Sequence, residues 1–264
     1  MGNSLGPVAL VGAGGVASAL GEAFAQAGIG IASVYSRTRE HAELLAGRFG
    51  AEAFWGNGFG VNQPAALTVV ASTDTAIVDL LGRVAEGGIV VHTSGSTSLP
   101  TLPAVPTGVF YPLQTFTLGR RISLEGVPIF IEGSTRKVEQ ILSDYARAIG
   151  ARPIPASSSK RRHLHLMGVV GCNFVNALLG ACEQIAQCGE LDPHVITPLL
   201  HETIQKWLDI GAHAAQTGPA KRRDEFTLMR HRVLLSEELP DLIPLYETLS
   251  ELIVRAHAEA RDEA

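Results

Sequence analysis

Short apolar runs alternate with longer amphipathic stretches through the first 157 residues of the chain. Runs of this length that are rich in Val, Ile and Leu predict strands buried on both faces. They occupy residues 8–11, 31–35, 67–71 and 89–93. Because the stretches between them have helical periodicity, the alternation predicts a mostly parallel sheet with helices on both faces.

The second half of this region is less regular but continues the same pattern. The glycine-rich residues 51–66 predict no more than a short strand at 53–55. Further strands are expected at 109–111, 127–132 and 152–155. Two prolines in the last of these predict an edge strand, because proline cannot donate a ladder hydrogen bond.

The pattern changes to helices alone after Ala156-Ser157-Ser158-Ser159, which we interpret as a linker. Four helices are expected, over residues 160–188, 193–210, 224–237 and 241–260. The sequence therefore predicts a doubly wound α/β domain at residues 1–157, followed by an all-α domain at residues 158–264.

The turn between the first strand and the first helix contains Gly12-x-Gly14-x-x-Ala17. Gly12 permits a tight turn, the missing Cβ of Gly14 lets the backbone approach a pyrophosphate, and Ala17 lets the helix pack closely. Free N–H groups at the helix N-terminus favour phosphate. This Rossmann fingerprint predicts a dinucleotide bound by Gly12, Ala13, Gly14, Gly15, Val16 and Ala17. A glycine-rich turn without a ligand is the alternative.

The end of the second strand predicts which dinucleotide is bound. NAD-preferring domains place a carboxylate there, whereas this chain has Ser36-Arg37-Thr38, a planar cation between two hydroxyls. We therefore expect NADP, although Ser36 or Thr38 capping the next helix, with a solvated Arg37, is the alternative. Further cofactor contacts are expected at other carboxyl ends of strands, from Ser72, Thr93, Ser94 and Gly95.

Several polar residues at these strand ends also have a purely structural interpretation. Asp74 is favoured as the N-cap of a helix that runs through Val84. Ser96 either lines the nicotinamide ribose with Thr93, Ser94 and Gly95 or is an ordinary turn residue, and His92 is either part of the site or a hydrogen-bonded core histidine.

Composition and charge narrow the classes of function. The 264 residues carry a formal charge of −5, which argues against a nucleic-acid surface. No apolar run reaches about 18 residues without polar interruption, so no membrane span is expected, and the lack of a signal peptide favours the cytoplasm. The three cysteines form no C-x-x-C pair, so we expect buried free thiols and no metal site.

Four short motifs, in their order along the chain, resemble a known family. They are His92-Thr93-Ser94-Gly95-Ser96, Tyr111-Pro112-Leu113-Gln114-Thr115-Phe116, Asn173-Phe174, and Thr217-Gly218-Pro219 with Asp224, Thr227 and His231. In these motifs the chain is similar to the Rossmann-like plus DUF2520 family of NADP oxidoreductases, which shares its architecture with pyrroline-5-carboxylate reductases and β-hydroxyacid dehydrogenases. The resemblance implies a Rossmann domain, a helical substrate and dimerisation domain, and NADP. The family usually has His-Pro in place of Tyr111-Pro112, and Arg-Gly-Asp in place of Arg222-Arg223-Asp224.

The helix expected at residues 160–188 carries the candidate catalytic side chains. At about 100° per residue, a straight helix places four polar residues within an arc of about 80°. They are Arg162, His165, Asn173 and Asn176. His165 is the candidate proton donor, because the pKa of an imidazole lies near neutrality. Asn173 and Asn176 are candidates for contacts with substrate or with the nicotinamide amide, or alternatively with a neighbouring helix or subunit.

Together these features predict an NADP-dependent oxidoreductase that transfers hydride to or from a small carbonyl or imine substrate. β-Hydroxyacid dehydrogenases use a lysine where this chain has Val169, so their mechanism is not expected. A non-catalytic NADP-binding sensor or regulatory protein is the alternative, and a flavin or deazaflavin enzyme is a third. Asp224 and His231 are second candidates for proton transfer, with a helix cap and a solvated residue as their structural interpretations.

The same helix also predicts an assembly. Residues 166–182 contain small and apolar side chains on several faces, and a helix of this kind must be covered on all sides. We expect a homodimer built by the C-terminal helices.

Overall fold

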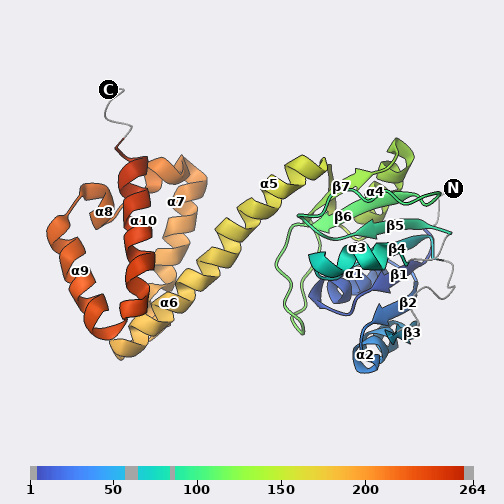
Figure 1. The fold of residues 1–264 in the computed structure, drawn as a ribbon, viewed down its shortest axis with the longest axis horizontal. Coiled ribbons are helices and arrows are strands. Elements are labelled where there is room, and N and C mark those ends of the chain that lie inside the picture. Colours follow the sequence, from blue (N-terminus) through green and yellow to red (C-terminus); the bar gives the residue numbers. More distant parts are fainter. Residues whose placement is uncertain (1–4, 57–64, 84–86, 259–264) are drawn as a thin grey trace. The chain divides into compact units, whose positions relative to one another are not determined.

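The computed structural model describes residues 5–56, 65–83 and 87–258 (Figure 1). The glycine-rich residues 57–64, the predicted helix end at Val84 and both ends of the chain lie outside the described residues. The chain divides into two compact units, Met1–Val170 and Gly171–Ala264. The domain boundary expected at residue 157 stays a prediction.

The first unit is built on one sheet with the strand order β3-β2-β1-β4-β5-β6-β7-β8. All neighbouring strands run parallel except β6 and β7, which are antiparallel. The strands are β1 (Val8–Val11), β2 (Ile31–Ser36), β3 (Glu52–Trp55), β4 (Leu67–Val70), β5 (Ile89–His92), β6 (Thr107–Pro112), β7 (Pro128–Gly133) and β8 (Arg152–Pro155). The predicted mostly parallel sheet is confirmed, with the proline-containing β8 at an edge.

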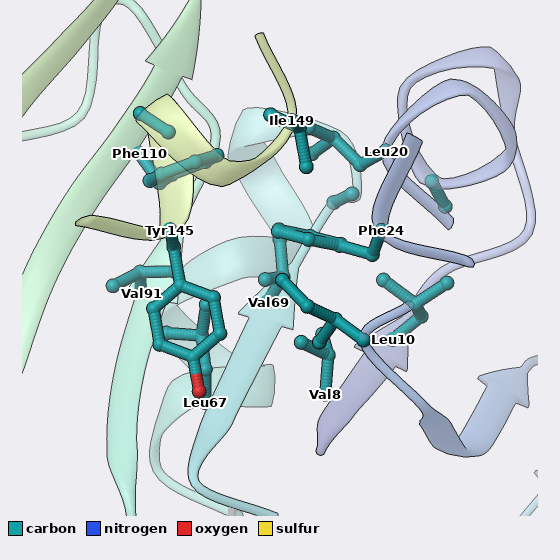
Figure 2. Packing of buried hydrophobic residues seen from close by; sticks show 14 of the residues in the cluster. Val8, Leu10, Leu20, Phe24, Leu67, Val69, Val91, Phe110, Tyr145 and Ile149 are labelled. Atoms are coloured by element: carbon teal, nitrogen blue, oxygen red, sulfur yellow. The ribbon is translucent and has the colours of Figure 1, made fainter. Parts of the chain in front are cut away.

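Side chains alternate along the strands, so the two faces of the sheet contact different helices. Leu10 packs in the larger core with residues of α1, α2 and α4, whereas the next residue, Val11, packs with residues of α3. These helices are α1 (Gly15–Gln26), α2 (Arg39–Phe49), α3 (Asp74–Leu81) and α4 (Arg136–Ala148). Figure 2 shows the larger core, where the Phe24 ring lies 6.2 Å from that of Phe110 and 5.9 Å from that of Tyr145. The doubly wound architecture is therefore confirmed.

Beyond Pro155 the described chain contains helices and no strand. The α-helices are α5 (Ser158–Gly168), α6 (Phe174–Cys188), α7 (Thr197–Ala215), α8 (Pro219–Arg222), α9 (Glu225–Glu238) and α10 (Ile243–Ala256). Short 3-10 turns at Pro193–Ile196 and Pro240–Leu242 precede α7 and α10. The predicted all-α C-terminal region is confirmed.

Two of the predicted helices contain a local irregularity. A π-helical turn at Val169–Asn173 lies between α5 and α6, within the continuous helical stretch Ser158–Cys188 that matches the helix predicted over residues 160–188. Gly211 has non-helical backbone angles (φ 78°, ψ 162°), so α7 consists of two helices joined across a kink at the position where the predicted helix ends. The π turn is a local change in backbone hydrogen bonding, which the spacing of apolar residues does not encode.

The helices of the second unit leave much apolar surface uncovered. No residue of the 19-residue helix α7 is buried, and its Trp207 side chain is 58% exposed. The prediction of buried thiols is also wrong for the described chain, because Cys172 and Cys188 are exposed and Cys182 is only partly buried, although all three are free.

The stretch Ser158–Cys188 is also long and apolar enough, by length and composition alone, to cross a membrane. Polar residues, among them Asn173 and Asn176, interrupt this stretch, so the expected lack of a membrane span stays a prediction. By itself, one such helix does not indicate a membrane protein. Arg161 and His165 near its beginning make polar contacts with the sheet.

The fingerprint glycines generate a prediction for stability. Gly12 has a φ of 125°, and a Cβ added there would lie 2.0 Å from the carbonyl oxygen of Ala71. Gly12→Ala should therefore lower the free energy of unfolding by more than about 2 kcal/mol, as measured by urea denaturation. Gly14→Ala is the matched control and should cost no more than about 1 kcal/mol, because Gly14 has an ordinary φ of −84° and caps α1. Equal losses in the two variants would contradict this assignment.

Candidate functional site

The fingerprint loop contains one glycine that packing within the chain does not explain. Gly12 is required by its φ and by the nearby Ala71 carbonyl, and Ala17 is fully buried in the larger core. A Cβ added at Gly14, in contrast, would meet no described atom within 4 Å. Gly14 therefore leaves open space at the N-terminus of α1, where unpaired N–H groups favour a phosphate. This cradle fits the pyrophosphate of a dinucleotide.

The loop after β6 packs against the same helix N-terminus. A Cβ added at Gly15 would lie 3.0 Å from the carbonyl oxygen of Phe116. Since β6 runs parallel to β5, with His92 opposite Val109, the two strands end at the same edge of the sheet. The motif that begins with Tyr111 therefore lies at the edge where the fingerprint lies.

The end of β2 presents a cation without a carboxylate partner. Among the described residues, no acidic side chain forms an ion pair with Arg37, and Arg37 is exposed. Arg39, in contrast, bonds Glu43 at 2.7 Å and lies 4.9 Å from the centre of the Trp55 ring. Thr38 is the N-cap of α2, but its hydroxyl makes no capping hydrogen bond within the described chain. Arg37 and Thr38 are both accessible to a ligand, and Ser36 is buried.

His92 has the structural role that the sequence allowed. Its side chain is fully buried, and Nδ1 accepts a hydrogen bond of 3.1 Å from the backbone N–H of Ser94. Nε2 therefore carries the proton and donates to the carbonyl oxygen of Ser98 at 3.1 Å. Burial lowers the pKa of His92 to about 4, although the bond to Ser98 opposes this shift. His92 is neutral at physiological pH and holds a turn.

The turn after β5 also uses its serine side chains internally. The Ser94 hydroxyl accepts hydrogen bonds from the backbone N–H groups of Ser96 and Thr97, at 3.1 and 2.9 Å. The Ser96 hydroxyl donates to the carboxylate of Asp74. The expected N-cap at Asp74 is wrong, because Thr73 is the N-cap of α3 and Asp74 instead accepts this bond. Thr93 and Ser94 are buried, and hydrogen bonds within the turn hold the Ser94 side chain in place.

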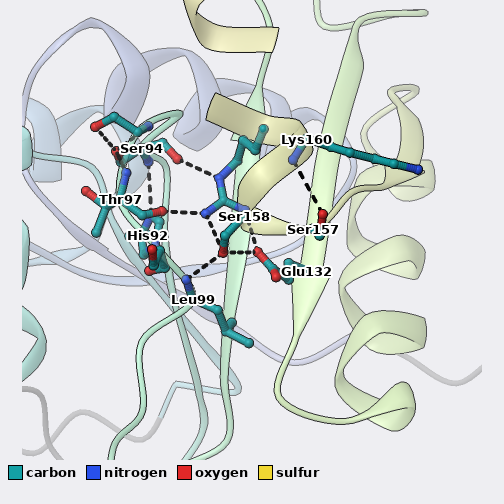
Figure 3. A network of polar contacts seen from close by, with 11 residues as sticks. His92, Ser94, Thr97, Leu99, Glu132, Ser157, Ser158 and Lys160 are labelled. Carbon is teal, nitrogen blue, oxygen red and sulfur yellow. Dashed lines mark hydrogen bonds and ion pairs between the residues drawn. The ribbon is translucent and has the colours of Figure 1, made fainter. Parts of the chain in front are cut away.

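Arg161, which the sequence did not single out, connects this turn to the rest of the edge. Figure 3 shows its partners Ser94, Thr97 and Glu132. Its fully buried guanidinium lies 2.6 Å from Glu132 in β7 and donates to the carbonyl oxygens of Ser94 and Thr97. The Ser158 hydroxyl also donates to Glu132, at 2.7 Å. Burial alone would raise the pKa of Glu132, but the hydrogen bonds from Ser158 and Arg161 outweigh it and hold that pKa below its usual value.

His165 lies one helical turn after Arg161 and faces the same edge. Its Nδ1 lies 3.1 Å from the Tyr111 hydroxyl, and the two rings meet edge to face with centroids 6.0 Å apart. A Cβ added at Gly95 would lie 2.6 Å from the His165 ring, so Gly95 is required by this contact. The structure therefore brings the predicted residues His165 and Gly95 together with Tyr111.

The other candidates on the long helix, Asn173 and Asn176, lie in the second unit. Asn173 ends the π turn, Asn176 lies in α6, and both belong to the second unit and are exposed. The common face predicted for them and His165 assumed α-helical spacing throughout, which the π turn interrupts. The functional roles of Asn173 and Asn176 stay predictions.

The second candidates for proton transfer have structural partners. The Asp224 carboxylate caps α9 by accepting from the N–H and hydroxyl of Thr227, and these bonds lower the pKa of Asp224. His231 Nδ1 lies 2.9 Å from the Tyr246 hydroxyl, within the second unit. The helix cap weighed for Asp224 is therefore what the structure shows.

Comparison with known proteins adds to this geometry. The domain of unknown function DUF2520 matches residues 127–253. A putative NADP oxidoreductase from Bacteroides fragilis is 35% identical, with a TM-score of 0.86 over 95% of this chain and 98% of that one. No curated protein matches the chain.

More distant structures share the fold. A reductive aminase from Aspergillus terreus, in complex with NADPH and ethyl-5-oxohexanoate, has a TM-score of 0.63 at 16% identity, over 96% of this chain and 94% of that one. A 1-pyrroline-5-carboxylate reductase from Streptococcus pyogenes has a TM-score of 0.56 at 9% identity, over 96% and 98% of the two chains.

The buried His92 generates a prediction for pH dependence. Its pKa is about 4 in the folded chain against 6.5 in the unfolded chain, so the unfolded state takes up the proton first as the pH falls. The stabilisation is complete above pH 6.5 and decreases between pH 6.5 and 4, by up to about 3 kcal/mol. Urea denaturation across this range should show the loss in the wild type and a smaller loss in His92→Gln. Identical pH dependence in both proteins would refute the assignment.

Proposed function

The chain belongs to the DUF2520 family, and from this membership and the geometry of the site we propose that it is an NADP-dependent oxidoreductase. The family resemblance carried by the four sequence motifs is thereby confirmed. One observation carries the proposal. The open cradle at Gly14 and the Tyr111–His165 pair lie at the same carboxyl edge of the sheet, where open α/β sheets bind ligands.

Three groups of residues hold NADP in this proposal. The pyrophosphate is bound by Gly12, Ala13, Gly14, Gly15, Val16 and Ala17. The 2′-phosphate is bound by Ser36, Arg37 and Thr38, and the nicotinamide side is lined by Ser72, Thr93, Ser94 and Gly95. Because the Ser94 hydroxyl already holds its turn, Ser94 contributes through its backbone.

The substrate is a small carbonyl or imine compound. Bound NADPH supplies hydride for its reduction. His165 provides the proton that the product oxygen or nitrogen requires, since it is half-buried at the edge where the cofactor cradle lies. We assign Asn173 and Asn176 to contacts with substrate or nicotinamide amide on sequence grounds alone.

Incubation of the purified protein with NADPH and a panel of aldehydes, ketones and cyclic imines tests the reaction. We expect loss of NADPH absorbance with at least one class, and a kcat lowered by at least about tenfold, on the order of 1.4 kcal/mol, in Asn173→Ala. Stoichiometric NADPH binding without oxidation across the panel would instead establish the alternative, a non-catalytic NADP-binding sensor. Val169, which replaces the lysine of β-hydroxyacid dehydrogenases, is the feature that favours this alternative.

Cofactor choice is tested at the end of β2. Arg37→Ala should weaken NADPH binding by roughly 1.5–3 kcal/mol, the range for hydrogen bonds to charged groups, and leave NADH binding nearly unchanged. Arg39→Ala is the matched control with a smaller expected effect, because Arg39 already contacts Glu43 and Trp55. Titration calorimetry that finds NADH bound by the wild type as tightly as NADPH would contradict this proposal.

The chain works as a cytoplasmic homodimer joined through its C-terminal helices. The support is the uncovered apolar surface of the second unit, above all α7, which buries none of its own residues. Large exposed apolar side chains gathered on one helical unit are typical of an interaction surface. No nucleic acid or membrane takes part.

Light scattering tests this assembly. The wild type should have the mass of a dimer at micromolar concentration, and Trp207→Asp should shift it to monomer by placing a charge in the interface. Val78→Asp is the matched control, since Val78 is 70% exposed on α3 of the first unit and should leave the dimer intact. A monomeric wild type would end the proposal.

A further inference from the structure

We infer that Tyr111 positions His165 for proton delivery by donating its hydroxyl hydrogen to Nδ1, so that Nε2 carries the proton given to the substrate. This inference rests on the proposed oxidoreductase function and names a residue of the same site. Its basis is the contact of 3.1 Å between the Tyr111 hydroxyl and Nδ1 of His165.

The sheet fixes the Tyr111 side of this pair. Tyr111 is opposite Phe130 in the antiparallel ladder of β6 and β7, and the two rings lie 6.4 Å apart. Pro112 follows and restricts the backbone at the end of the strand. The hydroxyl is therefore held at the carboxyl edge by a paired strand, and not by a loop.

His165 is fixed from two other directions. The Gly95 backbone lies against its Cβ, Cγ and Nδ1, where any larger residue at position 95 would collide with the ring. Arg161, four residues earlier on α5, is bound to Glu132 and to the carbonyl oxygens of the β5 turn. With Nδ1 engaged by Tyr111, Nε2 is the ring nitrogen that no described residue bonds.

Burial keeps the Tyr111 hydroxyl in its protonated form. It raises the pKa of Tyr111, Arg161 opposes this shift, and Asp74 adds to it. The phenol therefore has a proton to donate at neutral pH, and when it donates to Nδ1 the neutral imidazole carries its own proton on Nε2.

The proton balance of the step follows from this arrangement. The N–H bond at Nε2 breaks as the substrate oxygen or nitrogen, which has received the electron pair of its double bond, takes that proton. The O–H bond of Tyr111 breaks at the same time, and a new N–H bond forms at Nδ1. Nε2 then takes a proton from water while Nδ1 returns its proton to the Tyr111 oxygen, so the net proton comes from solvent and the starting tautomer of His165 is restored.

Nitrogen NMR of the protein labelled with ¹⁵N-histidine tests the inference without cofactor. The His165 signals are identified by their loss in His165→Gln. In the wild type, at a pH where His165 is neutral, Nδ1 should give the signal of an unprotonated acceptor and Nε2 that of an N–H nitrogen. In Tyr111→Phe both signals should move toward the average of the two tautomers.

Tyr145→Phe is the matched control for losing a buried hydroxyl. Its hydroxyl donates to the Gly6 carbonyl at 2.9 Å, and burial raises the pKa of Tyr145 as well. The variant should leave the His165 signals and the rate of NADPH oxidation unchanged. Tyr111→Phe should lower kcat by at least about tenfold with little change in the KM for NADPH.

The outcomes separate this inference from the proposed function. Unmoved His165 signals in Tyr111→Phe, or moved signals with a wild-type kcat, would overturn the role of Tyr111 and leave the oxidoreductase intact. Absence of NADPH oxidation with every substrate would overturn the function, and proton delivery with it, although the signals would still report the hydrogen bond. Moved signals together with a lowered kcat support the inference.

Discussion

The buried guanidinium of Arg161 constrains the whole carboxyl edge of the sheet. A charge without solvent is costly unless fixed partners surround it, and removing one partner of such a pair typically costs about 3–5 kcal/mol. Glu132 from β7 and two carbonyl oxygens from the β5 turn meet this requirement. Because these partners come from segments 29 to 67 residues away, one side chain sets the position of α5 relative to the sheet. Because His165 lies one turn later on α5, the contacts of Arg161 also fix where His165 lies.

The architecture could be predicted from the sequence because each element leaves a local pattern. The apolar run of β1 and the small residues at 12, 14 and 17 lie next to one another, and the prolines of β8 mark an edge by removing donors. The π turn at Val169–Asn173 leaves no such pattern. A π turn forms when backbone N–H groups bond the carbonyl five residues earlier instead of four. The apolar spacing of residues 166–182 is compatible with both hydrogen-bonding patterns.

The site was harder to predict because its contacts are long-range. Tyr111 and His165 are 54 residues apart in the sequence. The sequence singled out each residue separately, but it contains no sign of the hydrogen bond between them. Arg161 was missed because it stands in the run Lys160-Arg161-Arg162, which has the composition of a solvated helix face. Arg161 differs from the exposed Arg162 in the residues that surround it in space, and the periodicity of α5 gives no information about those residues.

The two units differ in how they are stabilised, and this difference bears on function. The first unit buries its apolar side chains itself, each contributing about 1.5–3 kcal/mol. In the second unit Phe174, Trp207 and Leu208 remain more than half exposed, so these side chains contribute less to its stability. In the homodimer that we propose, the stability of the helical unit therefore depends on protein concentration, whereas the edge built by Arg161, Tyr111 and His165 does not. Dilution should loosen the helices that carry Asn173 and Asn176 while the Tyr111–His165 hydrogen bond persists.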